Sequence, residues 1–230
     1  MRNFAETFDG SMDMIKASIK TFLEPFKAFL NAVSGFWVGA ALITVIFAVL
    51  LIFNIVHNKD GLKEMKRPKN LAVCAMLIAL NVILGYFSIT FSSYLRVGFG
   101  FITAPAAAYM FGPIAGGIVA LLSDTASFVL KPTGGFLFTY TLNTAVAGMI
   151  YGMLLYGREL TFKRVFLCKL TVIAAVNIIL NSIALAPTAG SGMVGILPAR
   201  IIKNIILLPM QSVVVYEVLK IISNISKGRK

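Results

Sequence analysis

The sequence predicts an all-α integral membrane protein built from several apolar helices that each cross a lipid bilayer. Of the 230 residues, 58% are hydrophobic and only 13% are charged. The apolar residues gather in long runs without charge, as a chain surrounded by lipid requires. Residues 36–56 and 71–91 each reach the roughly 20 residues that a helix needs to span the hydrocarbon core.

Three longer uncharged runs follow, at residues 97–123, 132–157 and 170–199. The first of them contains Phe111-Gly112-Pro113, and Gly and Pro favour a break in a helix. We therefore expect separate helices near 99–111 and 113–130. With a last helix near 197–222, the pattern predicts seven spans, of which six form a core and one is an extra N-terminal span.

The chain divides into two predicted parts. Residues 1–66 form an N-terminal accessory segment with an amphipathic helix near 12–33, the span at 36–56 and a basic linker. Residues 67–230 form the six-helix core. The stretch before the first span is too long and too polar for a signal peptide, so we expect it to stay in the mature protein.

The positions of Lys and Arg predict the orientation in the membrane. Positive residues concentrate in the linker at 57–70, in the turn at 158–164 with Lys169 just beyond it, and in the C-terminal tail. Loops rich in Lys and Arg usually lie on the cytoplasmic side of the membrane, so the N-terminus is predicted outside and the C-terminus inside. The net charge of +12 follows from this topology and from attraction to anionic membrane lipid, so we expect no nucleic-acid partner.

The sequence carries few groups suited to catalysis or metal binding. It has one histidine, His57, and two cysteines, Cys74 and Cys168, which we expect to be free thiols in apolar surroundings. It contains no P-loop motif for ATP. We therefore expect neither an enzyme nor a bound metal ion or cofactor, and any uphill transport would need an ion gradient or a separate ATPase.

Charged residues in or beside the spans are the first candidates for a binding site. Asp124 lies within a span, where a carboxylate marks either a binding cavity or a buried structural hydrogen bond. Arg96 either snorkels to the interface or offers its planar guanidinium to a carboxylate or ring acceptor, and the scarcity of cations in the outer loops favours the second reading. Arg200 and Lys203 fall at the same predicted face, so the three cations together predict an entrance for an anionic solute.

Aromatic and small residues give two further predictions. Phe136 and Phe138 follow a Pro/Gly turn and form either a stacking surface for a flat ligand or an interfacial aromatic belt, and Asn143 is placed to hydrogen-bond a ligand. Ala75 and Ala79, like Gly112 and Gly116, are small residues at helical spacing. Such residues serve either packing within the protein or docking of a partner subunit.

Five segments resemble one family. They are residues 94–99 (YLRVGF), 110–113 (MFGP), 131–136 (KPTGGF), 148–152 (GMIYG) and 197–204 (LPARIIKN). In this order they are similar to the S components of energy-coupling factor (ECF) transporters, most closely the folate-specific ones. The likeness covers about residues 67–220, while the first 60 or so residues depart from the family.

The resemblance implies a six-helix protein in the bacterial cell membrane that captures a vitamin from outside. It implies association with a transmembrane coupling subunit, which would meet Ala75 and Ala79, and with two cytoplasmic ATPases. The positions that match family motifs, and so imply ligand contacts, are Arg96, Phe136, Phe138, Asn143, Arg200, Lys203 and Asn204.

The leading prediction is therefore an S component that captures folate or a close pterin derivative. One alternative is an S component for another vitamin. A second is a membrane scaffold or signalling protein whose accessory helix recruits partners. A membrane enzyme is disfavoured by the missing catalytic groups.

Overall fold

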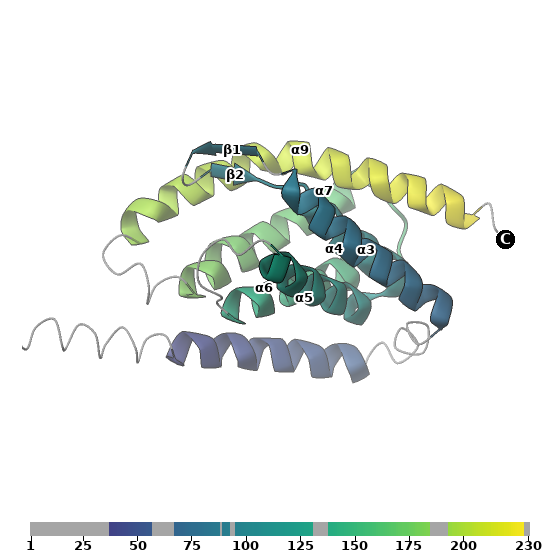
Figure 1. The fold of residues 1–230 in the computed structure, drawn as a ribbon, viewed down its shortest axis with the longest axis horizontal. Helices are drawn as coiled ribbons and strands as arrows, with labels where there is room; N and C mark the ends of the chain where they lie inside the picture. Colours follow the sequence, from purple (N-terminus) through teal and green to yellow (C-terminus); the bar gives the residue numbers. More distant parts are fainter. Residues whose placement is uncertain are drawn as a thin grey trace, which may run out of the picture.

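The computed structural model describes residues 37–56, 67–87, 89–92, 95–130, 138–184 and 193–227, and shows a bundle of helices along one long axis (Figure 1). An N-terminal helix, Trp37–Val56, precedes the labelled elements. These are α3 (Pro68–Tyr86), α4 (Thr103–Phe111), α5 (Pro113–Leu130), α6 (Phe138–Leu155), α7 (Phe162–Val172), the π-helical segment η2 (Ile173–Leu180) and α9 (Met193–Lys227). Successive long helices reverse direction, as expected of a chain that crosses a bilayer repeatedly.

The all-α membrane class is confirmed. Among the described residues, five helices are long and apolar enough to cross a membrane: Trp37–Val56, Pro68–Tyr86, Pro113–Leu130, Phe162–Ala184 and Ile201–Ile225. A shorter apolar helix covers Gly100–Phe111, and α6 lies outside this set of five. The predicted total of seven spans is therefore not confirmed, although the helices that it requires are in place.

The predicted break between α4 and α5 falls at Gly112. Its φ of 90° lies in the left-handed region, which glycine enters without a steric penalty because it has no Cβ. The N–H of Gly112 donates to the carbonyl of Ala108 at 3.0 Å and closes α4, and Pro113 begins α5. Phe111-Gly112-Pro113 thus ends one helix and starts the next, as predicted.

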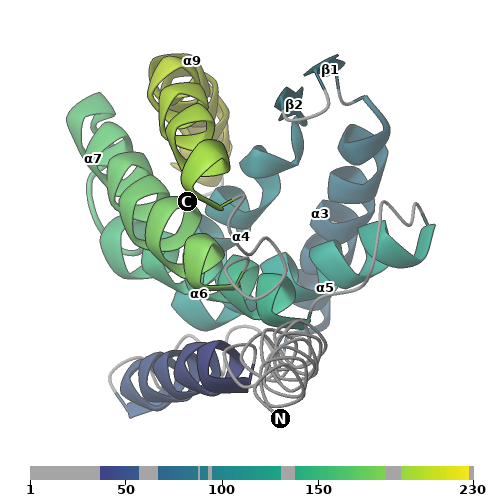
Figure 2. The ribbon, with the colours of Figure 1, turned by 90° about the vertical axis from the view of Figure 1, so that its left-hand side faces the viewer.

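The predicted span at 71–91 is wrong at its C-terminal end. Helix α3 ends at Tyr86, and an antiparallel hairpin follows, formed by β1 (Ile89–Ser92) and β2 (Leu95–Val97) with Thr90 opposite Arg96. The residues Ile-Thr-Phe-Ser alternate between apolar and polar side chains and are β-branched or aromatic in three of four places, which suits a strand. Figure 2 places this hairpin between the ends of α3 and α9.

Helices α5 and α6 form the most extensive helix pair among the described elements. A Cβ added to Gly148 on α6 would overlap the backbone of Gly116 on α5, so the two backbones touch directly. The small residue Gly116 therefore serves packing within the protein. This close pair forms one wall of the core.

The main core lies between α4, α6, α7 and α9. Its fully buried members include Ala108, Val146, Val165, Val215 and Leu219. Cys168 belongs to the same cluster and Cys74 to a neighbouring one, and both are free and buried, as predicted.

The N-terminal helix packs onto this core. Ile43 is fully buried in a cluster with Leu142 on α6 and with Leu180 and Ala184 at the end of the α7–η2 helix. Figures 1 and 2 place the helix on the side of the bundle away from α9 and the hairpin. The division at residues 66 and 67 stays a prediction, and the amphipathic helix expected near 12–33 lies outside the described residues.

Candidate binding cavity

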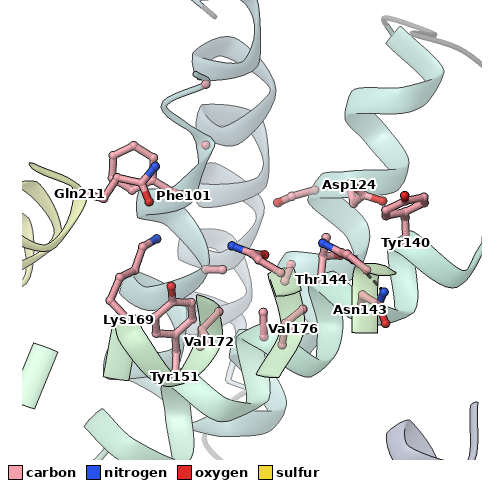
Figure 3. A pocket seen from close by; sticks show the side chains of 18 of the residues that line it. Phe101, Asp124, Tyr140, Asn143, Thr144, Tyr151, Lys169, Val172, Val176 and Gln211 are labelled. Carbon is pink, nitrogen blue, oxygen red and sulfur yellow. Dashed lines mark hydrogen bonds between the residues drawn. The ribbon is translucent and has the colours of Figure 1, made fainter. Parts of the chain in front are cut away.

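A cavity of about 450 Å³ lies within the core, in the range of about 300–1,000 Å³ typical of small-molecule sites. Its walls come from α3, the 3₁₀ turn η1 (Gly100–Ile102), α4, α5, α6, the α7–η2 helix and α9 (Figure 3). Among the lining residues, the polar and charged ones are Asn81, Ser123, Asp124, Ser127, Asn143, Thr144, Lys169, Asn177, Asn181, Lys203, Asn204 and Gln211, and the aromatic ones are Phe101, Tyr140 and Tyr151. So polar a cavity inside an apolar bundle indicates a site for a polar, partly aromatic molecule.

The carboxylate of Asp124 faces this cavity from α5. The hydroxyl of Thr141 on α6 donates to Asp124 Oδ2 at 2.8 Å, while Oδ1 accepts no hydrogen bond from the described residues. Asp124 therefore makes a structural hydrogen bond and lines a cavity at the same time, so both readings of the sequence describe it. One of its oxygens is left for a further donor.

Two more acceptors lie near Asp124. Asn143 is 1% exposed, and its Nδ2 donates to Asn181 Oδ1 at 2.8 Å. Asn143 Oδ1 and the Ser123 hydroxyl are buried without a hydrogen-bond partner among the described residues. Leaving such a group unmet costs about 1–3 kcal/mol. This wall of the cavity is therefore rich in acceptors that donors on a bound molecule or water would satisfy.

A lysine faces the cavity from another wall. Lys169 on α7 is only 5% exposed, and its Nζ lies 4.9 Å from the ring centroid of Phe101 and 5.7 Å from that of Tyr151. The sequence grouped Lys169 with the basic turn at 158–164 that it follows, but its side chain turns into the bundle and lines the cavity. Sequence reasoning missed it as a site residue, although it shares a helical stripe with the buried residues Val165, Val172 and Val176.

An amide from α3 supports the rim of the cavity. Asn81 Nδ2 donates to the Gly100 carbonyl at 3.0 Å and also to the Thr103 hydroxyl. Because Asn81 and Gly100 are far apart in the chain and meet only after the elements pack, helical periodicity did not reveal this contact. Tyr140, the third aromatic of the segment that holds Phe136 and Phe138, lines the cavity, and the further lining residues that were not predicted are Asn81, Phe101, Tyr151, Asn177, Asn181 and Gln211.

The structure brings four of the predicted ligand residues to one cavity: Asp124, Asn143, Lys203 and Asn204. Phe138 is 59% exposed and is not among the lining residues. Arg96 lies on β2 and Arg200 on α9, but their side chains lie outside what the structure describes, and Phe136 lies outside the described residues altogether. Ala75 and Ala79 are exposed on α3, away from the cavity.

Acidic and thiol groups do not gather elsewhere in the described part of the chain. There, no three His, Cys, Asp or Glu side chains lie close enough together to hold a metal ion. The polar cavity between α5, α6 and the α7–η2 helix is the candidate ligand site of the described ranges.

Comparison with known proteins agrees with this architecture. Two similar proteins are each named folate transporter FolT. The one from Clostridium novyi (strain NT) is 29% identical over 161 residues, which cover 70% of this chain and 94% of the relative. The one from Leuconostoc mesenteroides subsp. mesenteroides is 26% identical over 167 residues, covering 69% and 90%.

A solved structure shares the fold. The crystal structure of FolT bound with folic acid matches with a TM-score of 0.60 and 32% identity, and the match covers 66% of this chain and 92% of that one. The family model described as ECF transporter, substrate-specific component, matches residues 69–219. These residues contain every residue that lines the cavity and all but the two ends of the helical core from α3 to α9, so the chain belongs to the substrate-specific components, or S components, of ECF transporters.

Proposed function

We propose that this protein captures folate from outside the cell and delivers it inward as the S component of an ATP-driven ECF importer. The observation that carries the proposal is the polar cavity of about 450 Å³ in a chain whose relatives are folate transporters. The cavity pairs acceptors on one wall with aromatic rings and a cation on another. Folate offers a flat pterin ring with both donors and acceptors, and a glutamate tail with two carboxylates.

The wall formed by α5 and α6 suits the amino edge of the pterin. That edge carries the 2-amino group and the ring N3–H, both of which are donors. Asp124 and Asn143 both line the cavity on this wall. The Oδ1 atom of each accepts no hydrogen bond from the described residues. A hydrogen bond to a carboxylate contributes about 1.5–3 kcal/mol. Asp124 is therefore assigned to the amino edge.

Cations near the start of α9 suit the glutamate tail. Lys203 lines the cavity, and Arg200 lies one helical turn earlier on α9. Arg96 on β2 is assigned to the same end from its position in the sequence and from the family motif that it matches. Phe136 and Phe138 keep their assignment as stacking residues only as predictions, and Asn204 is assigned a hydrogen bond to the ligand.

The proposed orientation has the hairpin and the start of α9 outside and the C-terminus in the cytoplasm. Helix α3 is then the docking surface for the coupling subunit. In the most apolar stretch of α3 only 6% of the residues are buried, whereas in that of α5 44% are buried. Ala75 and Ala79 are exposed on α3. Small residues let a partner helix approach closely in lipid. Two ATPases bound to the coupling subunit would supply the energy.

Mass spectrometry of the ligand that co-purifies with the detergent-solubilised protein tests the substrate. We expect folate or a reduced folate. Calorimetry should then show that Asp124→Asn weakens folate binding about 10- to 100-fold, as expected for losing a charged acceptor. Glu159→Gln, which removes an exposed carboxylate in the α6–α7 turn, is the matched control and should bind folate normally. Recovery of a different vitamin, with no binding of folate, would reject the specificity.

Co-expression tests the transport machine separately. With a coupling subunit and two ECF ATPases of the same organism, we expect a stable complex that accumulates labelled folate only when ATP is hydrolysed. A protein that co-purifies with other partners and never with an ATPase pair would support the scaffold alternative instead.

A further inference from the structure

Lys169 holds the only ammonium group that the structure describes deep inside the helical core. It projects from α7 between a ring on η1 and a ring on α6, Phe101 and Tyr151, which are far apart in the chain. Its neighbours along the same helical stripe are the buried valines Val165 and Val172. An apolar side chain would fit this stripe better, so packing alone gives no reason for a lysine here.

The described residues leave the charge of Lys169 without an anionic partner. Its two ring contacts are cation–π interactions, and no carboxylate of the described residues lies within salt-bridge distance of its Nζ. Asp124 faces the same cavity from another side (Figure 3). A desolvated cation–π contact contributes about 2 kcal/mol, which offsets only part of the cost of keeping a charge out of water. Charged side chains within a membrane usually serve a ligand or a proton path.

We propose that Lys169 donates a hydrogen bond to the acceptor edge of the pterin ring and so fixes which way the ligand enters the cavity. The inference rests on the proposed function, because it takes folate as the ligand. A pterin carries donors at its 2-amino group and N3, and acceptors at its 4-oxo group and ring nitrogens. One flat ring therefore bridges the carboxylate of Asp124 and the ammonium of Lys169, with Phe101 and Tyr151 beside its apolar surface.

The position of Lys169 along its helix favours the pterin over the glutamate tail. At about 1.5 Å per helical residue, Lys169 lies about 22 Å before the end of its helix at Ala184, whereas Asp124 lies only about 9 Å before the end of α5 at Leu130. Measured from these two helix ends, which the proposed orientation places outside, Lys169 is the deeper of the two. Two carboxylates at that depth would share one ammonium, and burying a charge without its own partner is costly. Lys203, near the start of α9, is better placed for the tail.

Calorimetry with two probes tests the assignment. Folate and pteroate share the pterin ring, but pteroate lacks the glutamate. Lys169→Met removes the charge and keeps a side chain of similar length, and we expect it to weaken the binding of both probes equally, about 10- to 100-fold. Lys163→Met, at an exposed position on the same helix, is the matched control and should bind both probes as the wild type does.

Thermal unfolding of the ligand-free protein separates a binding role from a structural one. Replacing a buried charge by an apolar side chain of similar volume is often neutral or stabilising, so Lys169→Met should unfold at the same temperature as the wild type or higher, while its affinity falls. If that variant does not purify as a monodisperse protein, Lys169→Gln takes its place. We expect it to lose less affinity than Lys169→Met, and to lose the same amount for folate as for pteroate.

The other outcomes each overturn a defined part of the reasoning. A loss for folate but not for pteroate would place Lys169 at the glutamate and overturn the assignment. Unchanged affinity for both probes would remove Lys169 from ligand binding while leaving folate as the substrate. A wild-type protein that binds neither probe would overturn the proposed function together with this inference.

Discussion

Replacing Gly148 by alanine tests the contact that holds α5 and α6 together. An added Cβ at this position would overlap the carbonyl group of Gly116 and lie 2.9 Å from the amide nitrogen of Gly117. All of these are backbone atoms inside a helix, so they have no rotamer by which to move away. The two helices must separate, and the separation also stretches the hydrogen bond of 2.8 Å between Thr141 and Asp124 across the same interface.

The size of the effect follows from two opposing contributions. Overpacking a close contact costs about 1–3 kcal/mol, and replacing glycine by alanine inside a helix returns about 0.5–1 kcal/mol. Around the middle of these two ranges the net loss is about 1–2 kcal/mol, which in a chain of this size lowers the apparent Tm by about 2–8 °C. This shift in Tm is measured by heating the protein in detergent and recording the fraction that remains monodisperse at each temperature.

Gly85→Ala is the matched control for Gly148→Ala. Gly85 is also helical, but a Cβ added there meets nothing within 4 Å. Its apparent Tm should be unchanged or slightly higher than that of the wild type. If Gly148→Ala proved as stable as Gly85→Ala, the direct backbone contact between α5 and α6 would be refuted, and with it the rigid wall that carries Asp124.

Three further changes probe other parts of the structure. Thr141→Val removes the hydroxyl that donates to Asp124 but keeps the side-chain shape. Folate affinity, measured by calorimetry, should fall about 5- to 10-fold, which corresponds to the loss of one hydrogen bond from a neutral donor. Unchanged affinity would contradict the role of Thr141 in orienting the carboxylate. Ala79→Trp adds bulk to the exposed face of α3, so folate binding should persist while ATP-dependent uptake into vesicles is lost, and normal uptake would exclude this face as the docking surface. Ile43→Ala empties a fully buried position and should lower the apparent Tm by an amount equivalent to about 2–5 kcal/mol, whereas Val45→Ala on the exposed side of the same helix should change little.

The sequence predicted most helices because their signals are local. The span predicted at 36–56 is the helix Trp37–Val56, and the one predicted at 113–130 is α5. The hairpin at 89–97 was missed because its apolar residues continue the uncharged run of α3. Its alternation covers only four residues in β1, too few to separate a strand from the end of a buried helix.

The binding site could be predicted only where a single residue was conspicuous. Asp124 stands out because a carboxylate within a span is costly, and Asn143 because it follows an aromatic segment. Lys169 escaped because a lysine just after a basic turn fits the rule that cytoplasmic loops are positive. The contrary signal was its spacing from Val165, Val172 and Val176, which places it on the buried stripe of α7.

The rim of the cavity depends on contacts that no local pattern encodes. Asn81 reaches Gly100 across 19 residues of chain, and Asn143 reaches Asn181 across 38. Such pairs form only once the helices have packed. Their identity therefore required the three-dimensional arrangement.

The π-helical segment η2 allows one helix to serve both ends of the cavity. Lys169 and Asn181 both line it, yet twelve residues apart on an ideal α-helix they would point in directions about 120° apart. In η2 the N–H of Asn181 donates to the carbonyl of Val176, five residues earlier, and such wider turns advance less per residue. The segment thereby brings the two side chains back into angular phase. Deleting a single residue between 173 and 180 would let the segment close as an ordinary α-helix, whose eleven remaining steps of about 100° keep Asn181 within about 20° of the direction of Lys169.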